Sequence, residues 1–235
     1  PAGNMPSLLT LDEVETMFHE FGHALHGMLT KCNYKGVSGT SVAQDFVELP
    51  SQIMEHWAVE PEVLKLYAKH YETREVIPDE LITKIQNQGT FNQGFMTTEL
   101  LAAALLDMEL HNLTDTENLN VVAFEKETMD KLGLIPEIAP RYRATYFSHI
   151  IGGYAAGYYS YLWAEVLDTD AFEAFKEHGV FDKNTADSFR KNILEKGGTE
   201  DPMTLYRGFR GADPSLETLL KNSGLKSNRL LDRII

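Results

Sequence analysis

The chain has 235 residues, of which 43% are apolar and 24% are charged, a composition typical of a globular protein large enough to bury a substantial core. Its formal net charge of −14, with no basic stripe, argues against nucleic acid as a partner. No apolar run reaches the roughly 20 residues of a membrane span, so we expect no membrane partner. The single cysteine, Cys32, excludes an internal disulfide and fits a reducing compartment, so we expect a cytoplasmic protein.

The first predicted helix covers residues 11–29. Thr10 and Glu13 match a capping box, in which the threonine caps the first turn and the glutamate reaches back to it. Apolar residues then recur at helical spacing and predict one buried face. These residues are Val14, Met17, Phe18, Phe21, Leu25 and Met28.

The same helix contains the pattern His-Glu-x-x-His at His19, Glu20 and His23, away from that apolar stripe. Two histidines four positions apart are separated by about 40° around a helix and one turn along it, so both rings can reach one metal ion. Imidazole suits zinc, and Glu20 is placed to take a proton from water at the metal. The pattern predicts a zinc hydrolase, and we expect a peptidase; the alternative is a chance match in a core helix.

Two further residues of this helix leave alternatives open. Gly22 costs roughly 1 kcal/mol of helix stability relative to alanine, so it is either an accident of sequence or a place where a neighbouring segment approaches closely. His26 lies near the face of His19 but about 10 Å further along the axis, which is too far to share its metal. We expect His26 to line a groove or to support a ligand.

A catalytic zinc ion needs a third protein ligand and leaves its fourth position to water. We expect this ligand to be Glu48, because an acidic side chain between Val47 and Leu49 is costly to bury unless it is paired or binds a metal. Asp45, one turn earlier, is expected to accept the free N–H of a ligand histidine. The alternatives are a surface glutamate and a helix-capping aspartate.

Helices are predicted over most of the remaining chain, so the expected fold is a single all-α domain with at most a short hairpin at residues 34–42. Asp201-Pro202 and Asp213-Pro214 each resemble a capping residue followed by the first residue of a helix, and Gly224 resembles a helix stop. The other expected helices cover residues 50–57, 61–73, 78–89, 92–112, 118–132, 158–167, 170–177 and 184–195.

Residues 147–163 are rich in glycine and tyrosine. The glycines give this segment conformational freedom, as in loops that close over a substrate. Tyr154, Tyr158 and Tyr161 recur at helical spacing, and from the residues alone a helix face packed into the core is the preferred interpretation.

Several stretches together form a recognisable pattern: HEFGHALH at 19–26, SGT at 38–40, DFVELPSQ at 45–52, FSHI at 147–150, GGYAAGYYSYLW at 152–163 and YRGFRG at 206–211, followed by Asp213-Pro214. This pattern resembles the thimet-oligopeptidase family of zinc peptidases over nearly the whole chain. The resemblance implies a zincin-type helical catalytic domain and one zinc ion.

The resemblance also implies a role for individual residues. His19, His23 and Glu48 match the zinc ligands, and Glu20 matches the general base. His149, Tyr154 and Tyr161 match residues that bind substrate and stabilise the tetrahedral intermediate, whereas Tyr158 and Tyr159 are expected to pack in the core.

Within the family, residues 45–57 are most similar to the bacterial peptidyl-dipeptidase branch, which removes dipeptides from free C-termini. The oligopeptidase A branch, which cuts short peptides internally, is the near alternative. Gln44 stands where the first branch implies a basic residue, so a substrate carboxylate lacks one expected cation. Arg207 and Arg210 are candidates to replace it.

Family members are far longer than this chain, which resembles roughly their C-terminal third. We therefore expect residues 1–235 to be the C-terminal catalytic domain of a two-lobed protein whose N-terminal lobe is a missing partner. The expected substrates are short peptides, cleaved to release C-terminal dipeptides. The alternative from another class is a catalytically silent, zinc-binding helical fragment.

Overall fold

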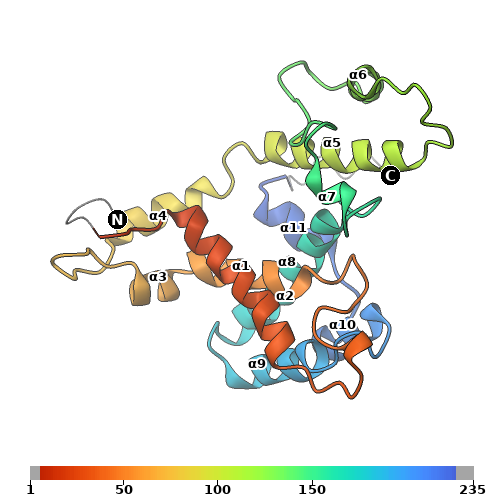
Figure 1. The fold of residues 1–235 in the computed structure, drawn as a ribbon. Coiled ribbons are helices and arrows are strands. Elements are labelled where there is room, and N and C mark those ends of the chain that lie inside the picture. The colour runs from red at the N-terminus through yellow and green to blue at the C-terminus, as the bar shows by residue number, and fades with distance from the viewer. Residues whose placement is uncertain (1–5, 226–235) are drawn as a thin grey trace.

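The computed structural model describes residues 6–225, and every regular element in that range is helical (Figure 1). The all-α prediction is therefore confirmed. None of these helices combines the length and the apolar character that a membrane span requires. The α-helices are α1 (Leu11–Met28), α2 (Leu49–Val59), α3 (Pro61–Tyr67), α4 (Asp79–Gln88), α5 (Gln93–His111), α6 (Val121–Lys131), α7 (Ser148–Ile151), α8 (Ser160–His178), α9 (Lys183–Phe189), α10 (Pro202–Arg210) and α11 (Leu216–Asn222), with a 3₁₀ turn η1 (Lys35–Val37) and a π-helical turn η2 (Arg190–Leu194).

Helix α1 begins at the predicted capping box. The backbone N–H of Thr10 donates to Glu13 Oε2 at 2.7 Å, and the N–H of Glu13 donates to Thr10 Oγ1 at 3.3 Å. The predicted apolar face is confirmed only in part: Val14 is buried and Leu25 packs against the main core, but Met17, Phe21 and Met28 are 52%, 53% and 65% exposed. The buried face is shifted from the predicted one, since besides Val14 it contains Gly22 and His26.

Gly22 is the place where α1 meets α2. A Cβ atom added to Gly22 would lie 2.2 Å from the carbonyl oxygen of Pro50 and 2.6 Å from Ser51 Cα. The two helices cross here backbone against backbone (Figure 1). Of the two interpretations of this glycine, the close approach is correct, and it fixes the start of α2 beside the His-Glu-x-x-His pattern.

The main core lies between α2, α8, η2 and α10. Its largest fully buried side chains include Phe46, Phe172 and Tyr206. A second cluster joins α5 to α7 and the segment before α8, through Ala103, Phe147 and other apolar groups. In Figure 1, α5, α6 and α7 stand above the crossing of α1 and α2, and α9 and α10 lie below it.

The predicted hairpin at residues 34–42 is wrong. The segment forms η1 and tight turns, with backbone bonds between residues three apart, such as Val37 N to Tyr34 O at 3.2 Å and Ser41 N to Ser38 O at 3.0 Å, and it also bonds to a distant loop. Val37 O accepts from Gly198 N at 2.9 Å, and a Cβ atom on Gly198 would lie 2.4 Å from Ser41 O. The only β-type pairing in the described range is an isolated antiparallel bridge between Lys69 and Val76.

Helix α8 runs unbroken where two helices, 158–167 and 170–177, were predicted. Asp168 and Asp170 lie at the predicted gap, and both are buried and bonded to side chains of other helices. Asp168 Oδ1 lies 2.6 Å from His56 Nε2, and Asp170 Oδ2 accepts from the Tyr206 hydroxyl at 2.6 Å.

The predictions for the C-terminal helices are confirmed except at one start. Asp201 caps α10 with Pro202 at its first turn, and Gly224 adopts φ +67° after α11. Helix α11 begins two residues later than predicted, with Ser215 rather than Asp213 as its N-cap. Asp213 instead pairs with Arg207.

Candidate functional site

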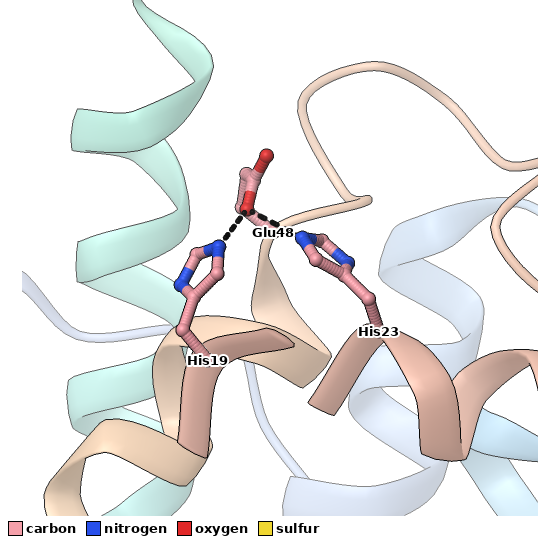
Figure 2. A group of neighbouring side chains, drawn as sticks. All are labelled: His19, His23 and Glu48. Atoms are coloured by element: carbon pink, nitrogen blue, oxygen red, sulfur yellow. Dashed lines mark ion pairs between the residues drawn. The ribbon is translucent and has the colours of Figure 1, made fainter. Parts of the chain in front are cut away.

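Two histidine rings and one carboxylate converge between α1 and the start of α2 (Figure 2). The Nε2 atoms of His19 and His23 each lie 3.3 Å from the same oxygen, Oε2 of Glu48. One potential ligand atom from each of the three residues lies within 4.8 Å of the other two. The sequence pattern therefore predicted a group that the fold does bring together.

The donor atoms and their spacing fit a zinc ion. Atoms that bind a tetrahedral zinc ion at about 2.0–2.1 Å are about 3.3–3.4 Å apart, and both Nε2 atoms are 3.3 Å from the Glu48 oxygen. Glu48 is only 1% exposed, and no lysine or arginine within residues 6–225 forms an ion pair with it. A buried carboxylate requires a positive or hydrogen-bonding partner, and a metal cation between the three residues meets that requirement.

Charge and hydrogen bonding set the protonation of the ligand group before a metal binds. Burial alone raises the pKa of Glu48, but hydrogen bonds from His19, His23 and two hydroxyl groups outweigh it and hold the pKa well below its usual range. Burial alone lowers the pKa of His19, but its bonds to Glu48 and Glu55 raise that pKa to about 10. Because a metal ion and a proton compete for the same imidazole nitrogen, metal binding here is expected to release protons.

The two hydroxyl groups come from different parts of the chain. Ser51 Oγ, one turn into α2, donates to Glu48 Oε2 at 2.8 Å. The Tyr154 hydroxyl donates to the other oxygen, Oε1, from the glycine- and tyrosine-rich segment. Glu48 thus connects the two histidines to that segment.

A second carboxylate orients His19, and it is not the predicted one. His19 Nδ1 lies 2.6 Å from Glu55 Oε1, which fixes the ring so that Nε2 faces Glu48. Asp45, which was expected in this role, accepts instead from the Tyr159 hydroxyl at 3.0 Å. The reason is geometric: Glu55 lies on α2 directly opposite α1, whereas Asp45 precedes that helix.

Glu20 lies in the chain between the two histidines, on an exposed part of α1. Within the part of the chain that the structure describes, its carboxylate makes no hydrogen bond or ion pair. A general base must be free to accept a proton from water, and the surroundings of Glu20 meet this condition.

The glycine- and tyrosine-rich segment places its aromatic rings around the same site. Tyr154 and Tyr161 stack with ring centroids 5.1 Å apart and 12° between their planes, and the His149 ring lies 5.9 Å and 6.1 Å from them. Burial raises the pKa of both tyrosines above its usual value, so their hydroxyls remain protonated donors. Tyr158 packs in the core as expected, but the same expectation for Tyr159 is wrong, because it is 42% exposed.

The two arginines considered for a substrate carboxylate already have partners. Arg207 Nε lies 2.7 Å from Asp213, and Arg210 pairs with Asp170 at 3.4 Å and with Glu177 at 3.3 Å. These bonds tie α10 to α8 and to the turn before α11. We therefore do not include the arginines in the site.

His26 and Gln44 lie near the site, and the structure shows the surroundings of each. His26 lines no groove: its ring is fully buried, and neither ring nitrogen has a hydrogen-bond partner among the described residues. Burial lowers its pKa to about 4. Gln44, in the place of the expected cation, packs its side chain against Gly157, where an added Cβ atom would lie 3.3 Å from Gln44 Cγ.

Sequence reasoning missed the supporting residues of α2, although a signal was present. Ser51, Gln52 and Glu55 follow Glu48 by three, four and seven positions, so all four share one helix face. Ser51 bonds to Glu48 and Glu55 bonds to His19, while Gln52 Nε2 donates to the backbone oxygen of Tyr161 at 3.2 Å. A run of polar residues at helical spacing after a proposed ligand marks such a face.

Comparison with known proteins agrees with this site. The family model described as peptidase family M3 matches residues 1–225. The chain is 46% identical to the dipeptidyl carboxypeptidase of Escherichia coli strain K12 over 232 residues, which are 96% of this chain and 34% of the relative. It is 44% identical to oligopeptidase A of the same strain over 229 residues. It is 35% identical to the thimet-like oligopeptidase of Dictyostelium discoideum over 227 residues. Both matches again cover 96% of this chain and 34% of the relative.

The chain thus spans about a third of the length of the curated relatives it matches. The family match extends over the His-Glu-x-x-His helix, the Glu48 segment and the glycine- and tyrosine-rich segment alike. With its metal-ligand geometry and this match in agreement, the chain belongs to peptidase family M3.

Proposed function

We propose that this chain carries the catalytic centre of a zinc peptidase that cleaves short peptides. The convergence of His19 and His23 on one Glu48 oxygen is the observation that carries the proposal, because two imidazoles and a carboxylate form the ligand set of an open, catalytic zinc site. When bound, zinc supplies Lewis-acid chemistry that makes water more acidic and polarises a peptide carbonyl.

In this proposal the side chains divide the remaining work. Glu20 takes the proton from the attacking water and passes it to the amine that leaves. Tyr161 donates its hydroxyl hydrogen to the oxyanion as it forms, with help from Tyr154 and His149. The raised pKa values of both tyrosines favour this role, since a phenol that stays protonated remains a donor.

We propose release of C-terminal dipeptides as the reaction, with internal cleavage as the second candidate. The dipeptidyl carboxypeptidase from Escherichia coli and its oligopeptidase A are 46% and 44% identical to this chain, so identity barely separates them. The similarity of residues 45–57 to the first branch supports dipeptide release. Gln44, an uncharged residue in contact with Gly157, favours internal cleavage, because it offers no charge to a terminal carboxylate.

Two further parts of the proposal concern the setting. Since the relatives are about three times as long, we propose that an N-terminal lobe completes the substrate cleft in a longer protein. The single cysteine supports a cytoplasmic location.

Mass spectrometry of products tests the reaction. Zinc-loaded protein is incubated with two peptides of one sequence, one with a free C-terminus and one amidated. Stepwise loss of dipeptides from the free peptide alone is expected; internal cuts in both would establish the oligopeptidase reaction instead.

Glu20→Gln supplies the matched control, because it removes the base and keeps the size of the side chain. We expect this variant to bind one zinc ion per chain and to lose turnover by several orders of magnitude. Normal turnover in Glu20→Gln would disprove the role of Glu20. An inactive wild-type protein with zinc bound would mean that the N-terminal lobe is required for cleavage or that the chain is only a zinc-binding fragment.

A further inference from the structure

The carboxylate of Asp107 is fully buried and lies outside the proposed catalytic group. It accepts backbone hydrogen bonds from the segment that contains the proposed catalytic tyrosines. Asp107, in the last turns of α5, is 0% exposed. Its Oδ1 accepts from the N–H of Ala156 at 3.0 Å, and its Oδ2 accepts from the N–H of Tyr158 at 2.9 Å. His111 Nδ1, one turn further along α5, lies 2.8 Å from Oδ1.

Burying this group is costly, and the packing of α5 does not require it. An isolated carboxylate in a protein interior is strongly unfavourable unless charge-assisted hydrogen bonds satisfy its oxygens. The neighbours of Asp107 on α5 are alanines and leucines that fill the second core cluster without it. Both oxygens of Asp107 are nevertheless used, and both bond to the segment between α7 and α8.

That segment needs to be held, because its backbone is strained at one residue. Ala156 adopts φ +52°, in the left-handed region that a side chain with Cβ disfavours. Such a conformation persists only where its surroundings determine it. Asp107 bonds to the N–H of this residue and to that of the second residue after it, so it fixes the strained turn from both sides.

The turn controls where the proposed catalytic tyrosines lie. Tyr154 is two residues before Ala156, and its hydroxyl donates to Glu48, the proposed metal ligand. Tyr161 stacks on Tyr154 with ring centroids 5.1 Å apart. A shift of the turn would therefore move both rings relative to the metal ligand.

We propose that Asp107 is a positioning residue for peptide hydrolysis, which holds the turn at Ala156 so that Tyr154 and Tyr161 face the metal centre. The proposal rests on the function proposed above. Asp107 touches no ligand residue itself and acts through two backbone N–H groups. His111 supports it by holding the carboxylate from the side of α5.

The substitution Asp107→Asn tests this in the whole protein. Asparagine has the same size, but an amide NH2 group replaces one carboxylate oxygen. A donor then faces a backbone N–H that needs an acceptor. We expect faster hydrogen–deuterium exchange of the amides in residues 152–159 and a kcat lower by about 10- to 100-fold, as for displaced catalytic groups. The KM should change by less than about threefold and bound zinc should stay at one per chain, because the ligands are untouched.

Asp115→Asn is the matched control. Asp115 follows α5 and also accepts a backbone N–H, that of Glu117 at 2.8 Å, but it is exposed. This variant should keep the kcat and the amide exchange of the wild-type protein. An equal effect of both substitutions would overturn the proposal.

The outcomes for Asp107→Asn are separable. Unchanged exchange in residues 152–159 or an unchanged kcat overturns the proposal. If the variant does not fold, His111→Ala decides. It leaves both backbone N–H bonds of Asp107 in place and removes the contacts of His111 Nδ1 with Asp107 Oδ1 at 2.8 Å and with the Asp107 carbonyl oxygen at 2.9 Å. A smaller fall of kcat with faster exchange supports the proposal, and wild-type values overturn it. If the wild-type protein cleaves no peptide, the proposed function fails, while the exchange measurement still decides whether Asp107 holds the segment.

Discussion

The contact between Gly22 and α2 gives a sharp prediction for Gly22→Ala. The new Cβ atom would lie 2.2 Å from Pro50 O, about 1.2 Å short of the 3.4 Å at which ordinary contact begins. Its nearest neighbours are backbone atoms, which cannot rotate away. Overpacking of this kind costs typically 1–3 kcal/mol, and we take about 3 kcal/mol, because α1 and α2 must separate. The better helix propensity of alanine returns roughly 1 kcal/mol.

The net loss of about 2 kcal/mol corresponds to a Tm lower by roughly 4–8 °C in a protein of this size. The separation also moves His19 and His23 away from Glu48, so zinc should bind more weakly in a competition with a chelator. Thermal unfolding followed by circular dichroism, with and without zinc, measures both effects.

Gly27→Ala is the control on the same helix. A Cβ atom at Gly27 would meet nothing within 4 Å, so this variant should gain the roughly 1 kcal/mol of helix propensity and melt at a higher temperature. If Gly22→Ala also melted at or above the wild-type temperature and bound zinc equally well, the close contact would not hold the site together.

Two other predictions follow from the groups beside the metal ligands. Glu55→Gln should weaken zinc binding by about 10- to 100-fold, because His19 loses the carboxylate that orients it; equal affinities in chelator competition would contradict this. Burial lowers the pKa of His26 to about 4, so between pH 6.5 and 4 the unfolded chain binds a proton that the folded chain does not. The free energy of unfolding, measured with denaturant, should therefore decrease by up to about 3 kcal/mol as the pH is lowered from 6.5 to 4. His26→Leu should not show this part of the loss. Equal losses in the wild-type protein and the variant would refute the role of His26.

Local signals in the sequence predicted the helices and the metal-ligand group well. The capping box at Thr10 and the caps at Asp201 and Gly224 act within a few residues, so their structure follows from their neighbours alone. The two histidines share a turn of one helix, and the cost of burying Glu48 indicated a partner for it. These inferences required no knowledge of how distant segments pack.

The errors arise where a distant segment determines the local structure. Residues 34–42 form turns rather than a hairpin, and the loop at Gly197 and Gly198 packs against them and donates to Val37 O. The gap predicted in α8 falls at Asp168 and Asp170, which bond to His56 and Tyr206 in the interior instead of ending a helix. Sequence pattern cannot distinguish a helix cap from a buried partner until the neighbouring helix is in place.

The single polar face of α2 has a consequence for insertions and deletions. One face of this helix supports the proposed ligand through Ser51, the ligand histidine through Glu55, and the start of α8 through Gln52. Adding or removing one residue would turn everything beyond it by about 100° around the axis. All contacts past that point would be lost together. We therefore expect length variation among relatives to avoid residues 48–55 and to collect in the turns, such as the one between α3 and α4.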